Sequence, residues 1–142
     1  MSIEPPALDF TPLDRAVTRL REGLLRYHID ESDSQIRDGL MQRFEFTYDL
    51  AHKMIRRTIE AGSANPEEVD RMTFPTLIRT AVEQGLTGAD WPRWRTWREM
   101  RNITSHTYDE TKALQVAAEI PSFLSEAEGL VARLEAAGGA HR

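Results

Sequence analysis

The segment SQIRDGLMQRFEFTYDLAHKMIRRTIEA, residues 34–61, carries the longest helical pattern in this 142-residue chain. Its apolar side chains recur every three or four residues, and at 100° per residue they form one stripe. The stripe holds Ile36, Leu40, Phe44, Ala51, Met54, Ile55 and Ile59, and Phe46 and Leu50 widen the apolar arc to about 220°. The remaining polar wedge holds Asp38, Gln42, Glu45, Asp49, Lys53, Arg56 and Glu60. So wide an arc predicts a central helix that is buried against several partners, including a second subunit.

Helical patterns fill most of the remaining chain. Further helices are expected over residues 11–28, 75–85 and 109–137, and another that Asp90 caps at its start, with a short turn before Phe74. The hydroxyl of Thr11, followed by Pro12, is expected to cap the first helix, and Pro121 to kink or split the last one. No segment alternates with a period of two for long enough to be a strand. The sequence therefore predicts a single all-α domain over residues 1–142, an up-and-down four-helix bundle with an additional short helix, which dimerises.

Composition excludes several classes of site. The chain has no cysteine, which rules out disulfides, thiolate metal ligands and a cysteine nucleophile. No glycine-rich phosphate loop is present, so the chain is not expected to be an NTPase or a nucleotidyltransferase itself, and we expect no cofactor. Four scattered histidines, at positions 28, 52, 106 and 141, do not suggest a metal site. With neither a secretory signal nor an apolar stretch of about 20 residues, a cytoplasmic protein that does not contact membranes is expected.

The charge distribution is uneven. The net charge of −5 argues against a wholly basic nucleic-acid binder, yet residues 91–101 contain four arginines and a single acidic residue. Lys53 and Lys112 are the only lysines among the 18 basic residues. Arginine suits bidentate contact with phosphate better than lysine does, which favours a phosphate ligand. A GC-rich genome that prefers arginine codons would give the same composition, and composition does not separate these two interpretations.

The segment Arg101–Asp109, RNITSHTYD, gathers several chemically active groups. Arg101 supplies a permanent cation, Asn102 an amide, His106 an imidazole that titrates near neutral pH, and Tyr108 a phenol. Cleavage of RNA requires a base that takes the proton of the 2′-hydroxyl and a cation that stabilises charge on the phosphate. No metal is needed when the 2′-hydroxyl is the nucleophile. These residues therefore predict a metal-independent ribonuclease site.

The spacing also allows a purely structural interpretation. On a straight helix, Arg101 and His106 would lie about 140° apart, so they converge only if the helix ends near Ser105 or if two chains contribute. Alternatively, the segment is an ordinary helix end, with His106 against the helix dipole, Tyr108 packed and Arg101 in a surface ion pair.

Two blocks of the sequence resemble a known family. Residues 101–108 follow the pattern R-x4-H-x-Y, and residues 37–51 read RDGLMQRFEFTYDLA. Together they are similar to the HEPN superfamily, in its nucleotidyltransferase substrate-binding protein branch. The resemblance implies a dimeric helical bundle whose partner is a separate, minimal nucleotidyltransferase.

The resemblance also implies a function. Related HEPN proteins are ribonuclease toxins in which Arg and His from both subunits line a cleft; here these are Arg101 and His106, with Asn102 beside them. Their nucleotidyltransferase partners act as antitoxins, in some systems by adenylylating the tyrosine of the motif, here Tyr108. The competing interpretation is a non-catalytic substrate-binding or scaffold subunit of the nucleotidyltransferase.

The tryptophan stripe, Trp91, Trp94 and Trp97, offers two interpretations. Interleaved with Arg95 and Arg98, it could stack RNA bases, with the two arginines binding RNA. Packing in the core or at a dimer interface is the more common use of such a stripe, and we favour it.

Two residues of the central helix stand out from their surroundings. Arg43 falls within the apolar arc, so we expect it to snorkel or to pair with Glu45 or with a carboxylate of the other subunit. His52 stands where the family resemblance predicts a tryptophan, and its place on the polar edge predicts a surface position.

Overall fold

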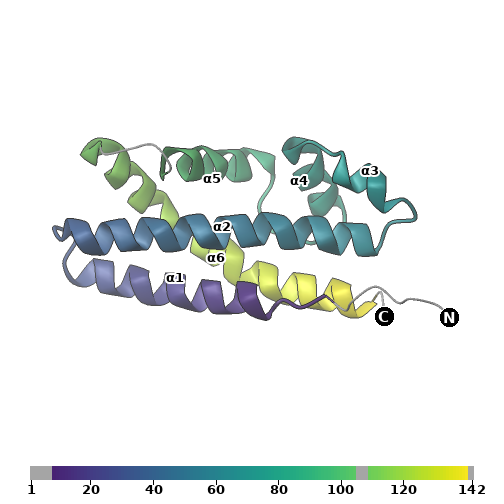
Figure 1. Cartoon of the computed structure of the whole chain (residues 1–142), viewed down its shortest axis with the longest axis horizontal. Coiled ribbons are helices and arrows are strands. Elements are labelled where there is room, and N and C mark those ends of the chain that lie inside the picture. Colours follow the sequence, from purple (N-terminus) through teal and green to yellow (C-terminus); the bar gives the residue numbers. More distant parts are fainter. Residues whose placement is uncertain (1–7, 105–108, 141–142) are drawn as a thin grey trace.

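The computed structural model describes residues 8–104 and 109–140 (Figure 1). Within them the chain is all-helical, as predicted, with six helices and no strand. The helices are α1 (Thr11–Ile29), α2 (Ser34–Ala61), α3 (Pro66–Asp70), α4 (Phe74–Glu83), α5 (Trp91–Thr104) and α6 (Glu110–Ala140). Figure 1 shows α2 running lengthwise through the molecule, with α1 along one side and α3, α4 and α5 along the other. Helix α6 crosses α2 and packs on α1, α2 and α5.

Helix α2 has the bounds that the sequence predicts, and its ends explain why. Asp33 caps its N-terminus, because its carboxylate accepts hydrogen bonds from the backbone N–H groups of Gln35 and Ile36 at 3.0 and 3.2 Å. Gly62 occupies its C-cap. The apolar stripe is largely buried by other helices of the same chain, while Phe46 remains 60% exposed. The wide arc is thus mostly covered without a second subunit.

The tryptophan stripe on α5 lies in the core. Trp94 and Trp97 are fully buried, with their rings edge to face at 5.1 Å. Both rings also contact Phe123 of α6, and the indole N–H of Trp97 donates a hydrogen bond to the hydroxyl of Ser122 at 3.1 Å. The expected core role is confirmed for these two residues, so they are not available to stack RNA bases. The stripe therefore provides no argument for a second subunit.

The start of α1 and the course of α6 differ from what the sequence predicts. Thr11 is the first residue of α1 rather than its cap, and the carboxylate of Asp9 accepts the Thr11 backbone N–H at 3.0 Å. Helix α6 continues unbroken through Pro121, which is exposed, so the proline does not split the helix. It also continues to Ala140, beyond the expected end, and Gly138 packs so closely on the ring of Phe10 that a Cβ there would lie 3.1 Å from it.

Candidate functional site

The motif residues are only partly within the described part of the chain. Arg101 and Asn102 lie in the last turn of α5, where Asn102 is exposed and Arg101 is half-buried. His106 and Tyr108 lie outside the described residues. The structure therefore shows how one side of the candidate site, the guanidinium of Arg101, is held.

Two carboxylates of α2 hold Arg101. Its Nε and Nη2 donate hydrogen bonds to the two carboxylate oxygens of Asp49 at 2.9 and 3.0 Å. Nη2 also lies 3.2 Å from Oε1 of Glu45. Glu45 and Asp49 are four residues apart, so they project from the same face of α2 towards α5. The hydrogen bond from Arg101 to Asp49, more than any other influence, raises the pKa of Arg101 above its ordinary value.

A third side chain joins this arrangement at the end of α5. The hydroxyl of Thr104 lies 3.1 Å from Oε2 of Glu45 and 2.6 Å from the backbone carbonyl oxygen of Arg101. Both oxygens of the Glu45 carboxylate are thus engaged with the last turn of α5, one by Arg101 and the other by Thr104. We call Glu45 and Asp49 the carboxylate pair.

The surface ion pair expected of Arg101 under the structural interpretation is present, but its partners were not predicted. Both Glu45 and Asp49 were assigned to the polar wedge of the central helix, where Glu45 was suggested as a partner of Arg43 and Asp49 was given no partner. The signal that could have identified them is their spacing of four residues on that wedge, opposite a basic helix. Periodicity gives the face on which a residue lies, however, and does not show which distant helix covers that face.

The surface position predicted for His52 is wrong. His52 is half-buried, its ring lies 4.3 Å from that of Phe74 of α4, and its Nε2 is buried without a hydrogen-bond partner. Burial, aided by the charges of Arg56 and Arg98, lowers the pKa of His52 to about 4. The imidazole is therefore neutral at pH 7. The sequence placed His52 correctly on the polar edge of α2 but could not show that Phe74 packs over this edge.

Arg43 does not pair with Glu45, which was one of its expected partners. Its Nη1 donates a hydrogen bond to the backbone carbonyl of Arg19 in α1 at 2.7 Å. Glu45, the partner suggested by sequence, contacts Arg101 instead. Arg43 therefore joins α1 to α2 and does not belong to the candidate site.

The two candidate RNA-binding arginines of α5 differ in their surroundings. Arg95 is exposed and lies 3.4 Å from the carboxylate of Glu99, one helical turn away. Arg98 is exposed as well, but its guanidinium carbon lies 5.4 Å from the centre of the Phe74 ring. It makes no ion pair with any described residue. Arg98 thus presents a cation held against an aromatic face close to Arg101.

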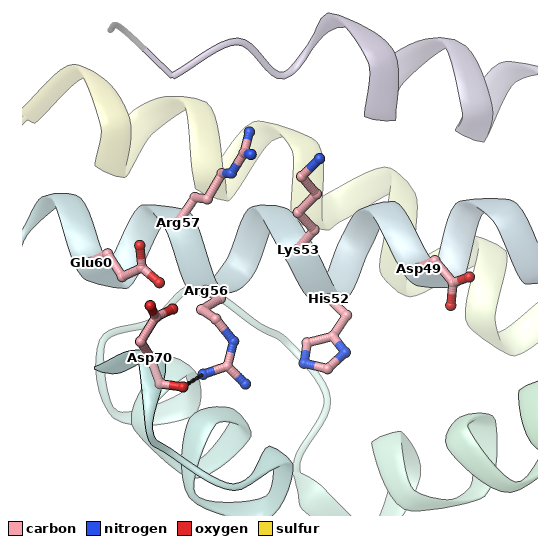
Figure 2. Close-up of a pocket in the computed structure, with 7 residues that line it drawn as sticks. All are labelled: Asp49, His52, Lys53, Arg56, Arg57, Glu60 and Asp70. Carbon is pink, nitrogen blue, oxygen red and sulfur yellow. Dashed lines mark hydrogen bonds between the residues drawn. The ribbon is translucent and has the colours of Figure 1, made fainter. Parts of the chain in front are cut away.

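An open groove of about 500 Å³ begins at Asp49 and follows α2 towards α3 (Figure 2). Figure 2 shows His52 and Arg56 pointing towards α3 and α4, whereas Lys53 and Arg57 point to the other side of α2. The groove is lined by Asp49, His52, Lys53, Arg56, Arg57, Glu60 and Asp70. Its basic and acidic side chains balance, so its charge does not mark it as a phosphate site.

At the far end of the groove, Arg56 contacts backbone rather than carboxylates. Its Nη1 donates to the carbonyl oxygen of Val69 at 2.6 Å, and Nη2 donates to that of Met72 at 3.3 Å. Beside it, Figure 2 shows the carboxyl groups of Glu60 and Asp70 facing each other. Burial and a hydrogen bond with Asp70 raise the pKa of Glu60. This end of the groove joins α2 to α3.

The described residues contain neither a group of metal-ligating side chains nor a helix that could span a membrane. No three His, Asp or Glu side chains there lie together as metal ligands would. No helix within residues 8–104 and 109–140 has the length and the apolar character required to cross a membrane.

Comparison with known proteins identifies the family. Residues 8–136 match the model of the family described as nucleotidyltransferase substrate binding protein like. A Haemophilus influenzae protein named "Probable ribonuclease HepT" is 36% identical over 129 residues, which cover 88% of this chain and 86% of that protein.

Solved structures agree with this match. A Haemophilus influenzae structure, described as revealing the fold of a substrate binding domain of a nucleotidyltransferase, superposes with a TM-score of 0.82 at 34% identity, covering 89% of this chain and 99% of that one. A Thermus thermophilus structure shares the fold, with a TM-score of 0.69 at 24% identity over 86% of this chain and 98% of that one. With its HEPN-type arrangement of helices, this chain belongs to the nucleotidyltransferase substrate-binding protein-like family.

Proposed function

We propose that the chain is a HEPN-type toxin, a metal-independent endoribonuclease that a partner nucleotidyltransferase neutralises. The observation that carries the proposal is the guanidinium of Arg101. It is held in a defined orientation at the end of α5, five positions before His106, in a chain 36% identical to a protein named a probable ribonuclease. A fixed guanidinium next to an imidazole in sequence supplies the two groups that RNA cleavage requires.

The proposed roles follow from the chemistry of each group. His106 takes the proton of the RNA 2′-hydroxyl, whose oxygen attacks the adjacent phosphorus and displaces the 5′-oxygen of the next nucleotide. Arg101 stabilises the negative charge that develops on the phosphate oxygens. Asn102, exposed beside Arg101, donates a hydrogen bond that orients the phosphate. Arg95 and Arg98 bind the flanking RNA backbone.

The proposed assembly is a homodimer that also meets the nucleotidyltransferase. Phe46 of α2 is 60% exposed, and Leu114 of α6 is 46% exposed, although both are large apolar side chains. Exposed apolar side chains of this size favour an interface. In light scattering, the wild type is expected at twice its 16.2 kDa chain mass, and Phe46→Glu closer to one chain mass. A monomeric wild type at micromolar concentration contradicts the dimer.

Neutralisation is proposed to act on Tyr108. The nucleotidyltransferase transfers AMP from ATP to the tyrosine oxygen, which loses its proton, and pyrophosphate leaves. The added phosphodiester carries a negative charge that competes with RNA phosphate for Arg101, and the adenosine adds bulk beside the site. Co-expression followed by intact-mass spectrometry should show one or more added AMP units that disappear in Tyr108→Phe. A neutralised protein of unmodified mass would instead indicate inhibition by binding.

The second candidate function is a non-catalytic substrate-binding subunit of the nucleotidyltransferase. The solved Haemophilus structure described as having the fold of such a domain, at 34% identity, favours it. A scaffold would retain its activity in Arg101→Ala and His106→Ala.

Cleavage of RNA by the purified chain tests the leading proposal. Wild type should cleave a mixed RNA substrate in the presence of EDTA and arrest growth when overexpressed. Arg101→Ala and His106→Ala should be at least about 100-fold slower and harmless. Because Arg101 and its partners are partly exposed, both variants should keep the helical circular dichroism spectrum. Variants that are folded and equally active or toxic would overturn the assignment of the site.

A further inference from the structure

We infer that Glu45 and Asp49 are positioning residues, which hold the guanidinium of Arg101 in the orientation that RNA cleavage uses. This inference rests on the proposed ribonuclease function and adds two residues of α2 to it. Neither residue belongs to the R-x4-H-x-Y segment, and both lie more than 50 positions before Arg101 in the sequence.

The geometry restricts Arg101 more than a single ion pair would. Asp49 contacts Nε and Nη2 through both of its oxygens at 2.9 and 3.0 Å, which fixes the plane of the guanidinium as well as its position. Glu45 adds a second contact to Nη2 at 3.2 Å. A free arginine side chain samples many rotamers and loses conformational entropy when it is ordered. Because the carboxylate pair orders the side chain in the free protein, this entropy is not lost when RNA binds.

Glu45 also fixes the backbone that carries Arg101. Its second oxygen lies 3.1 Å from the hydroxyl of Thr104, and this hydroxyl lies 2.6 Å from the carbonyl oxygen of Arg101. The last turn of α5 is therefore bound to α2 at two positions, Arg101 and Thr104. A contact to the Arg101 side chain alone would leave the backbone of this turn free to move relative to α2.

The negative charge of the carboxylate pair makes a positioning role distinguishable from direct RNA binding by kinetics. Two carboxylates and one guanidinium carry a combined charge of −1, so the carboxylate pair repels an RNA phosphate that approaches Arg101. Removal of one carboxylate should therefore slow the chemical step without weakening RNA binding. A residue that binds RNA directly shows the opposite behaviour, a raised KM with kcat preserved.

Cleavage kinetics on a defined RNA test the inference, with Asp49→Asn and Glu45→Gln compared with Asp38→Asn. Asp38 is the matched control, because it is an exposed carboxylate of the same polar wedge that makes no ion pair with a described residue. Asp49→Asn should lower kcat about 10- to 100-fold, Glu45→Gln less, and Asp38→Asn less than 2-fold, with KM unchanged or lower throughout. An unchanged or raised kcat in Asp49→Asn, or a raised KM with kcat preserved, would overturn the positioning role.

A double-mutant cycle separates action through Arg101 from an independent effect. In the Arg101→Ala background, Asp49→Asn should cause no further loss, since the group that it positions is already absent. Multiplicative losses would contradict the inference. If Arg101→Ala itself cleaves RNA at the wild-type rate, the proposed function of Arg101 fails, and the positioning role in cleavage fails with it.

An NMR measurement, which does not depend on ribonuclease activity, tests the contact between Arg101 and Asp49 directly. The Nε–H of Arg101 should give a resolved NMR signal that exchanges slowly with water in wild type and in Asp38→Asn. It should move and exchange at least about 10-fold faster in Asp49→Asn, because a hydrogen bond to a charged acceptor protects the proton. An unchanged Arg101 signal in Asp49→Asn would show that the carboxylate pair does not hold the guanidinium, independently of any ribonuclease assay.

Discussion

Two arginines connect α2 with the helices beside it, and their partners differ in kind. Arg56, on α2, extends to the backbone carbonyls of Val69, Asp70 and Met72 at the far end of the groove. Arg101, on α5, extends to side-chain carboxylates of α2. Asp49 stands at the Arg101 end of the groove and His52 lies between the two ends.

The difference in partners indicates a difference in purpose. Carbonyl groups in the last turn of a short helix and just beyond it require donors, and Arg56 donates to them, so its contacts stabilise α3 and its connection to α4. The two carboxylates around Arg101 satisfy no backbone group of a described residue, and a partly exposed ion pair adds little stability. We therefore expect Arg101 to contribute little to the free energy of unfolding, as its proposed chemical role requires.

The largest expected effect is the loss of the proposed ribonuclease activity in Arg101→Met. We expect cleavage to fall at least about 100-fold, because a cation at the developing charge is removed. The free energy of unfolding should change by less than about 1 kcal/mol, because the ion pair is partly exposed. Cleavage rates and urea unfolding of the same preparation measure both quantities. A large loss of stability would place Arg101 with Arg56 as a structural residue.

Arg56→Met should give the reverse result. Removal of hydrogen bonds from a charged donor to partly buried carbonyls should lower the free energy of unfolding by about 2 kcal/mol. Cleavage per folded molecule, in turn, should stay within about 2-fold of wild type, since Arg56 does not contact Arg101. Urea unfolding followed by circular dichroism measures the stability, and a strong loss of kcat in the folded variant would contradict the comparison.

The contrast between the two arginines also shows what could be predicted from sequence. The spacing of apolar residues on α2 and of tryptophans on α5 predicted most of the buried side chains on those faces, with Phe46 an exception, because burial follows helical period. The two carboxylate partners of Arg101 could not be predicted, since several acidic residues on the polar wedge have the same pattern. His52 was misplaced for the same reason, because only the tertiary structure brings Phe74 over it.

The lowered pKa of His52, which lies between the two arginines, leads us to expect that stability depends on pH. Its pKa in the folded chain is about 4, below the ordinary value of 6.5, so the unfolded chain binds the proton more readily. Stability from this group is fully present above pH 6.5 and is lost as the pH falls towards 4. Arg56 and Arg98 oppose protonation of the imidazole, and Asp49 favours it.

Replacement of His52 measures this contribution. Between pH 7 and pH 4.5, wild type should lose about 1–2 kcal/mol more free energy of unfolding than His52→Gln, after allowance for the solvent that reaches the ring. Urea unfolding at several pH values gives the difference, and the carboxylates that titrate in both proteins cancel. Parallel curves for the two proteins would show that the ring is accessible and titrates normally.

The smallest expected effect distinguishes the two arginines of α5 that flank the same region. Arg98 lies against Phe74 without an ion pair to a described residue, whereas Arg95 pairs with Glu99 at 3.4 Å. If the RNA backbone passes over this face, Arg98→Ala should raise KM about 5-fold with kcat unchanged, and Arg95→Ala less than 2-fold. Arg98→Lys should fall between wild type and Arg98→Ala, because an ammonium keeps the charge but not the planar stacking on the ring. Equal effects of Arg95→Ala and Arg98→Ala would mean that only the summed charge of the helix attracts RNA, and that the contact with Phe74 has no part in binding.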